Sequence, residues 1–222
     1  MSRAVPPPVL STGVQALDRM IGGLSFVEFF GEWEAIRILL HRFIVEHSGE
    51  LEILLTQEFG ALDTIALRRL GKNLGVKPEA VLSRSFSLQS TIELLRGAVT
   101  STVPVVAVVD PYLFAPKGAE GYGDLTPITA ALRELGLKKS VAVFNRRSQF
   151  GRGLPEGGTY HHHSVPVLVE VTATPSALSA RIVKHPSSPP DRVLFSYAEV
   201  YGTRTAGPGK QTLLTEWTGR GG

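Results

Sequence analysis

Residues 26–47 read FVEFFGEWEAIRILLHRFIVEH, and this stretch decides the fold. Its first part, Phe26 to Phe30, predicts a buried β-strand because four of its five residues are apolar. Apolar side chains then recur at helical spacing over residues 34–47, so a helix is expected there. Its apolar face contains Ile36, Leu39, Leu40 and Phe43. A strand that leads directly into an amphipathic helix is typical of layered α/β proteins.

The same alternation continues on both sides of this stretch. A short helix through Ala16 and Ile21, capped by Ser11 or Thr12, is expected to end at Gly22–Gly23. Later strands are predicted at 51–56, 80–86, 103–110 and 140–145, and helices at 61–74, 90–99 and 126–136, the last ended by Gly136. The segment 103–110 is apolar on both faces, as in a central parallel strand.

The C-terminal third is rich in predicted strands, at 165–172, 177–184 and 192–199, and these alternate like antiparallel strands. The pattern therefore predicts an α/β fold: a mostly parallel sheet flanked by helices, with an antiparallel C-terminal extension. We expect a Pro-rich N-terminal arm over 1–9, one core domain over 10–200 and a tail over 201–222.

The composition narrows the classes of function. The 222 residues include no cysteine, which excludes disulfides, a thiol nucleophile and a cysteine-based zinc site. The net charge of +3 permits nucleic-acid binding without arguing for it. Asn73 and Asn145 are the only asparagines, a weak sign of a thermophilic source. The N-terminus is too short and proline-rich for a signal peptide, and no apolar run could span a bilayer, so we expect a soluble cytoplasmic protein without membrane contact.

The order of motifs resembles the RecA/RadA family of recombinase ATPases. The stretches that carry the resemblance are LSTGVQALDRMIGG (10–23), FFGEWEAIRI (29–38), TQE (56–58), VVAVVD (105–110), VAVFN (141–145), PEGGTYHHHSVPVLVEV (155–171) and ARIVKHPSSPPDRVLFSYAE (180–199). The resemblance implies a RecA-like P-loop NTPase core, of the kind found in archaeal RadA paralogues. We expect no counterpart here to the family's N-terminal helical DNA-binding domain or to its Phe-x-x-Ala polymerisation segment.

The phosphate-binding motif is degenerate. A P-loop reads G-x-x-x-x-G-K-[S/T]; its small residues let backbone N–H groups wrap the phosphates, its lysine neutralises them and its hydroxyl binds Mg²⁺. Here Gly31 matches the first glycine, while Ile36, Arg37 and Ile38 replace the second glycine, the lysine and the hydroxyl. Glu32 and Glu34 add negative charge. We expect the strand-to-helix framework to survive, with Arg37 still able to pair with an anion, but productive ATP hydrolysis is disfavoured.

Other positions of the nucleotide site keep two interpretations. By resemblance, Glu58 would activate water, Asp110 would hold Mg²⁺ and Asn145 would be a sensor. In the alternative interpretation, Glu58 is solvated or pairs with Arg37. Asp110 is then simply an acid at the end of a strand, and Asn145 forms a turn. At 184–186, Lys-His-Pro replaces the acidic Asp-x-Pro turn with which the family caps a neighbour's nucleotide. The resemblance thus predicts a vestigial site at Gly31, Arg37, Asp110 and Asn145, with no cofactor, although ATP and Mg²⁺ stay possible.

Two loops could bind single-stranded DNA, as the corresponding loops of the family do. The first, 115–125, contains Lys117 and Tyr122, and the second, 145–158, contains Arg146, Arg147, Phe150 and Arg152. Cations that contact phosphates and aromatic rings that stack on bases suit binding that tolerates any sequence. The alternative is that both loops are soluble connectors.

His161–His163 form a triple histidine that could suggest a metal site. If the segment is extended, His161 and His163 share one face, but two ligands do not make a strong site. We therefore expect no metal there, and His163 or its neighbour to match a family histidine that links the nucleotide site to the second loop.

Three functions remain open. The first is a RadA paralogue that acts as an accessory factor in homologous recombination and DNA repair, binding DNA, a RadA-type recombinase or another paralogue. The second is an atypical DNA-dependent ATPase that uses Arg37, Glu58 and Asp110. The third is a structural subunit of a hetero-oligomer.

Overall fold

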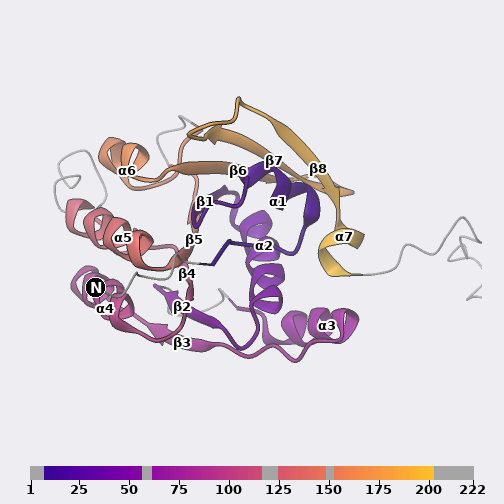
Figure 1. Cartoon of the computed structure of the whole chain (residues 1–222), viewed down its shortest axis with the longest axis horizontal. Helices are drawn as coiled ribbons and strands as arrows, with labels where there is room; N and C mark the ends of the chain where they lie inside the picture. Colours follow the sequence, from indigo (N-terminus) through magenta and orange to yellow (C-terminus); the bar gives the residue numbers. More distant parts are fainter. Residues whose placement is uncertain (1–7, 57–61, 117–124, 149–152, 203–222) are drawn as a thin grey trace, which may run out of the picture.

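An eight-stranded sheet runs through the molecule in the order β3-β2-β4-β5-β1-β6-β7-β8 (Figure 1). The computed structural model describes residues 8–56, 62–116, 125–148 and 153–202. The strands are β1 (Phe26–Gly31), β2 (Leu51–Leu55), β3 (Val81–Arg84), β4 (Val105–Val109), β5 (Ser140–Arg146), β6 (Val167–Ala173), β7 (Ala177–Lys184) and β8 (Arg192–Ser196). The first six strands of this order are mutually parallel, and β7 is antiparallel to both β6 and β8, which confirms the predicted fold class.

Helices cover both faces of the sheet. They are α1 (Gln15–Ile21), α2 (Trp33–Glu46), α3 (Thr64–Leu74), α4 (Leu88–Thr100), α5 (Thr126–Lys138), α6 (Gly158–Ser164) and α7 (Tyr197–Tyr201). Figure 1 shows α4, α5 and α6 on one side and α1, α2, α3 and α7 on the other. Two apolar clusters fill the space between the sheet and these two layers, one per face. The β-strand alternation explains this division, since successive side chains of each strand point to opposite faces.

The centre of the sheet is as apolar as the sequence indicates. All five residues of β4 are buried, and in the adjoining core Phe144 of β5 stacks on Phe29 of β1 and meets Phe43 of α2 edge to face. Among the described residues, no helix is long and apolar enough to cross a membrane.

Four local predictions were wrong. Neither Ser11 nor Thr12 caps α1: its N-cap is Val14, and the Thr12 hydroxyl instead accepts from the Val14 N–H and donates to Asp18 Oδ1 at 2.7 Å. The strand β6 pairs parallel with β1 and is antiparallel only to β7. The predicted strand 192–199 ends at Ser196, whose side chain caps α7.

The fourth error concerns Gly136, which lies inside α5 instead of ending it. A Cβ at this position would collide with the ring of Phe26 on β1. Glycine is therefore present because the helix approaches the sheet closely, a tertiary reason that resembles a helix stop in the sequence.

This explanation predicts opposite effects at two helical glycines. Gly97 lies in α4, and a Cβ there would meet nothing within 4 Å. Gly97→Ala should raise the free energy of unfolding by about 1 kcal/mol through helix propensity. Gly136→Ala has the same propensity gain but should lower the free energy of unfolding, because overpacking costs about 1–3 kcal/mol. Urea unfolding of both variants measures the difference, and equal gains would contradict the packing role of Gly136.

Candidate functional site

The carboxyl ends of β1, β4 and β5 meet at one edge of the sheet, where the vestigial nucleotide site was predicted. At this edge β1 ends at Gly31, and α2 begins at Trp33, so Glu32 alone connects them. The first helical hydrogen bond, from the Ile36 N–H to the Glu32 carbonyl, is 3.1 Å long. The expected strand-to-helix framework is therefore present, but the loop within it is reduced to a single residue.

Gly31 and Ile36 have structural roles in this connection. The backbone of Gly31 pairs with Arg146 and Val171, and a Cβ on Gly31 would collide with the carbonyl of Val171. Ile36 is fully buried in the core and lies within α2, so its position requires no positive φ. Neither residue is arranged to wrap a phosphate.

Arg37 lies one turn into α2 and pairs with Glu34 across 2.6 Å. Burial, and secondly the charge of Arg37, lower the pKa of nearby His41 to about 4. The neutral His41 Nε2 accepts the N–H of Asp63, the N-cap of α3. Arg37 therefore belongs to a side-chain network of the helices.

Asp110 follows β4 with a left-handed backbone (φ 54°), a conformation that aspartate tolerates better than most residues. Its side chain is almost fully buried and its Oδ2 accepts from Arg146 Nε at 2.6 Å. The guanidinium of Arg146 also lies 5.2 Å from the ring centroid of Trp33, within cation–π range. The strand-end acid thus holds a cation that the chain itself supplies.

The residues at this edge do not fit Mg-ATP. A one-residue connection cannot provide the successive N–H groups that surround a β-phosphate. Ile38 offers no oxygen to Mg²⁺, and the carboxylate of Asp110 is already bound by Arg146. Glu58, the candidate base, lies outside the described residues.

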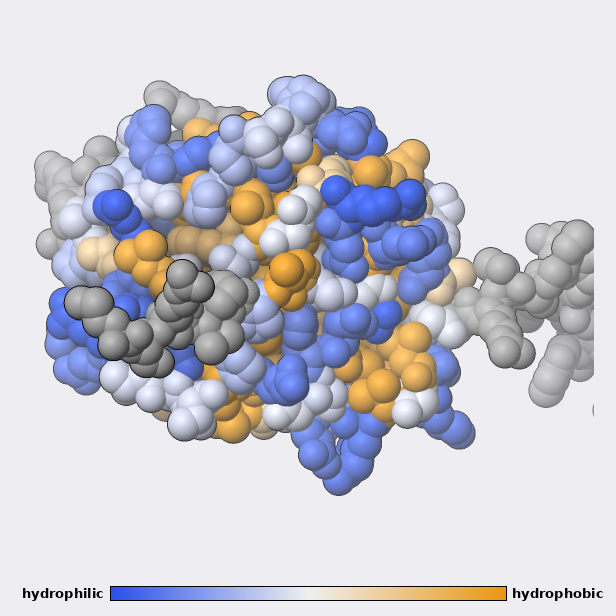
Figure 2. All heavy atoms as spheres, in the orientation of Figure 1, coloured by the Kyte–Doolittle hydropathy of each residue, from blue (hydrophilic) through white to orange (hydrophobic). Residues whose placement is uncertain are grey.

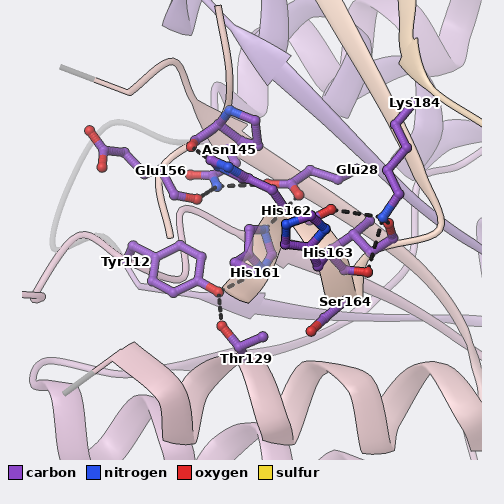
Figure 3. A network of polar contacts seen from close by, with 12 residues as sticks. Glu28, Tyr112, Thr129, Asn145, Glu156, His161, His162, His163, Ser164 and Lys184 are labelled. Atoms are coloured by element: carbon purple, nitrogen blue, oxygen red, sulfur yellow. Dashed lines mark hydrogen bonds and ion pairs between the residues drawn. The ribbon is translucent and has the colours of Figure 1, made fainter. Parts of the chain in front are cut away.

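Asn145 is a buried part of β5, which excludes the turn-former alternative. Its Nδ2 donates to Glu28 Oε1 at 2.7 Å and to the carbonyl of Glu156 at 2.9 Å (Figure 3). Its Oδ1 accepts the N–H of Arg146 at 2.8 Å. Asn145 therefore links the central strand to the segment that follows β5.

Glu28 is the centre of a buried polar network that the sequence analysis did not identify. It lies in the middle of β1 and is fully buried, as is His161 of α6. The His161 Nε2 lies 2.6 Å from Glu28 Oε2 and donates to this carboxylate, and the Nδ1 of the same ring lies 2.8 Å from the Tyr112 hydroxyl. The Tyr112 oxygen lies 2.9 Å from the Thr129 hydroxyl on α5 (Figure 3).

Burial raises the pKa of Tyr112 well above its usual value, so this hydroxyl stays protonated. The network therefore connects β1, β5, α5 and α6 through a continuous chain of hydrogen bonds. A single acid within an otherwise apolar strand was the only sequence signal for it, since a buried carboxylate requires partners.

The triple histidine is helical, not extended, so the expected sharing of one face by His161 and His163 is wrong. His161 points into the network, His162 Nε2 bonds the carbonyl of Pro155 at 2.8 Å, and His163 is exposed. Lys184 donates to the carbonyls of His162, His163 and Val165 (Figure 3), which satisfies the end of α6. Within the residues that the structure describes, no group of three metal-binding side chains occurs.

Arg146 and Arg147 are the members of the predicted DNA-binding set that the structure describes. Arg147 donates to Glu170 Oε1 at 2.7 Å, and Arg181 of β7 donates to the other oxygen at 2.7 Å. The structure thus brings three guanidiniums and two carboxylates together, with Trp33 beside them. The remaining candidates, Lys117, Tyr122, Phe150 and Arg152, lie outside the described ranges.

The buried network predicts unequal roles for neighbouring histidines. His161→Ala should lower the free energy of unfolding by about 3–5 kcal/mol, because Glu28 stays buried without its donor. His163→Ala, two residues away on the surface, should change it by less than about 0.5 kcal/mol. Denaturant unfolding tests both variants, and equal small effects would show that the Glu28–His161 bond contributes little.

Comparisons with known proteins agree with the fold. No protein-family model matches the chain, and no curated protein sequence does. Among solved structures, the chain is similar to the RadB recombinase, with a TM-score of 0.67 and 15% sequence identity over 86% of this chain and 97% of that chain. At this identity the similarity establishes the architecture alone. The chain therefore has a RecA-like fold, the fold of a recombinase, whose strand-end edge holds internal ion pairs.

Proposed function

We propose that this protein is an accessory factor in homologous recombination and DNA repair that does not hydrolyse ATP productively. In this proposal it binds single-stranded DNA, the active RadA-type recombinase, or both. The observation that carries the proposal is the one-residue connection between β1 and α2, together with the Arg146–Asp110 ion pair. The fold is that of a recombinase, while the groups that would hold a triphosphate are replaced by contacts within the chain.

The charge at the strand-end edge supports a contact with DNA. The side chain of Arg146 is 45% exposed and that of Arg147 is 36% exposed, so both keep N–H groups accessible to solvent. Within these ion pairs three guanidiniums face two carboxylates, and Glu32 of the connection adds an exposed carboxylate at the same edge. A partly exposed Trp33 lies under Arg146, where an aromatic ring can contribute stacking. Cations beside an aromatic face suit a single strand in any sequence.

The nucleotide part of the proposal predicts no stabilisation by Mg-ATP. A ligand that binds the folded state at 100 times its Kd adds about 2.7 kcal/mol to stability. A thermal melt over increasing Mg-ATP should therefore show a constant Tm. A saturable rise in Tm that Arg37→Ala abolishes would contradict the proposal and favour the atypical ATPase.

The DNA part predicts a change in the salt dependence of binding. Removing two phosphate contacts from a single strand reduces the slope of log affinity against log salt by about 1.4, or 0.7 per contact. Arg146→Ala combined with Arg147→Ala should weaken binding and reduce this slope, measured by fluorescence anisotropy of a labelled oligonucleotide.

The matched control is Arg68→Ala with Arg69→Ala, an adjacent exposed pair on α3 that removes the same charge far from the strand-end edge. Melting curves verify that each variant is folded. An equal loss of slope in both variants would show that the change comes from the lower net charge and not from contacts of Arg146 and Arg147. If the wild-type protein binds no DNA, two functions remain: a factor that binds the recombinase, and a structural subunit of a hetero-oligomer.

A further inference from the structure

One edge of the sheet is apolar and exposed. Strand β3 is the outermost strand and pairs only with β2 among the described residues. Its residues Val81 and Leu82 are 53% and 43% exposed, and Phe86 just after it is 61% exposed. Figure 2 shows hydrophobic surface at the lower margin of the molecule, over β3, and toward the lower right, over α3 and α7. An edge of this kind accepts a further strand unless something covers it.

Both faces of this edge are apolar. The parallel register places Leu82 beside Ile53, whose side chain lies in the cluster that contains α2 and α3. Val81 pairs with Glu52, which shares a face of β2 with Leu54, and Leu54 lies in the cluster on the opposite side of the sheet. Leu82 and Arg84 therefore face the α3 side, and Val81 faces the α4 side. A strand that covers this edge must be apolar at two consecutive positions, one for each face.

The chain itself leaves the described part close to this edge. Helix α7 packs against α2 and α3, and Asn73 Nδ2 donates to the Tyr201 carbonyl at 3.1 Å. Gly202 lies against Leu74, at the end of α3. Only six residues separate that end from the start of β3, a span of at most about 25 Å. Residues 203–222 follow Gly202, outside the described residues.

This tail contains a segment with the required pattern, LLTE at 213–216. Leu213 and Leu214 are consecutive, so in an extended strand they point to opposite faces. The eleven residues from Gly202 to Leu213 can span up to about 36 Å, more than the distance to β3 demands.

We propose that residues 213–216 add to β3 of the same molecule as a ninth, parallel strand. The register places Leu213 beside Val81 and Leu214 beside Leu82. It also places Thr215 beside Ser83 and Glu216 beside Arg84. Each pair is then apolar with apolar, hydroxyl with hydroxyl, or acid with base, the combinations that favour neighbouring strands. An antiparallel strand would instead place Glu216 beside Val81 when Leu213 lies beside Arg84.

The absence of cysteine allows a direct test in the full chain. Adjacent strands lie about 4.8 Å apart, within the Cα separation that a disulfide accepts. Leu82→Cys with Leu214→Cys should oxidise rapidly to an intramolecular disulfide, read by a mobility shift on non-reducing gels and by mass spectrometry. The expected rate is several-fold above that of two control pairs.

The first control, Leu82→Cys with Leu213→Cys, shifts the tail by one residue to the opposite face. The second, Leu194→Cys with Leu214→Cys, uses the exposed Leu194 on β8, the other edge strand. An undocked tail would still bring its cysteine near the surface at about millimolar effective concentration, and the three pairs would then react at similar rates. Similar rates, or a disulfide-linked dimer as the main product, would overturn the proposal.

Amide hydrogen exchange tests the same contact without cysteines. Leu214→Asp in the full chain should accelerate exchange over residues 81–84, because it places a charge against Leu82. Leu194→Asp should leave that exchange unchanged. Unchanged exchange in both variants would also reject the docked tail.

Discussion

A carboxylate in the middle of the central strand constrains the rest of this structure. Glu28 is fully buried, and an unpaired buried acid is strongly unfavourable. Asn145 and His161 satisfy it from β5 and α6, and Tyr112 extends the network from His161 to α5. These bonds place α6 and the segment around Glu156 against the sheet. The positions of Arg146 and Arg147 at the adjacent strand end follow, because Asn145 accepts the N–H of Arg146.

At the strand-end edge, charged side chains pair with one another within the chain. Arg146 supplies the positive charge beside Asp110, and a helix that begins at Trp33 occupies the place of a phosphate-binding loop. Lys184 has a comparable role on α6, whose terminal carbonyls it satisfies. Lys184 therefore has a structural function that does not require a nucleotide. These contacts are the physical basis for the proposed accessory, non-hydrolysing role.

The site was only partly predictable from the sequence. The residue types alone show that Ile36, Arg37 and Ile38 supply neither the glycine, the lysine nor the hydroxyl of a P-loop. The one-residue connection was not, because Glu32 and Trp33 have no propensity that distinguishes a helix start from a loop. The Glu28–His161 bond joins residues 133 positions apart, and no local pattern indicates such a pair. The pairing of β6 was predicted wrongly, because the alternation of apolar and polar residues indicates which face of a strand is exposed and not the direction of the neighbouring strand.

The sequence by itself determined the order of the strands and of helices α1 to α5, the apolar central strand β4 and, through a resemblance to a known family, the RecA-like class of fold. The order of elements and the apolar strand follow from periodicity and residue type, which act within a few neighbouring residues. Only the tertiary structure decided that Gly136 continues a helix, that the histidines around His161 are helical, and that Asp110 binds Arg146. In each case a contact with a distant strand or helix outweighs the local preference, since packing and the pairing of buried polar groups are worth more than the propensity of one residue.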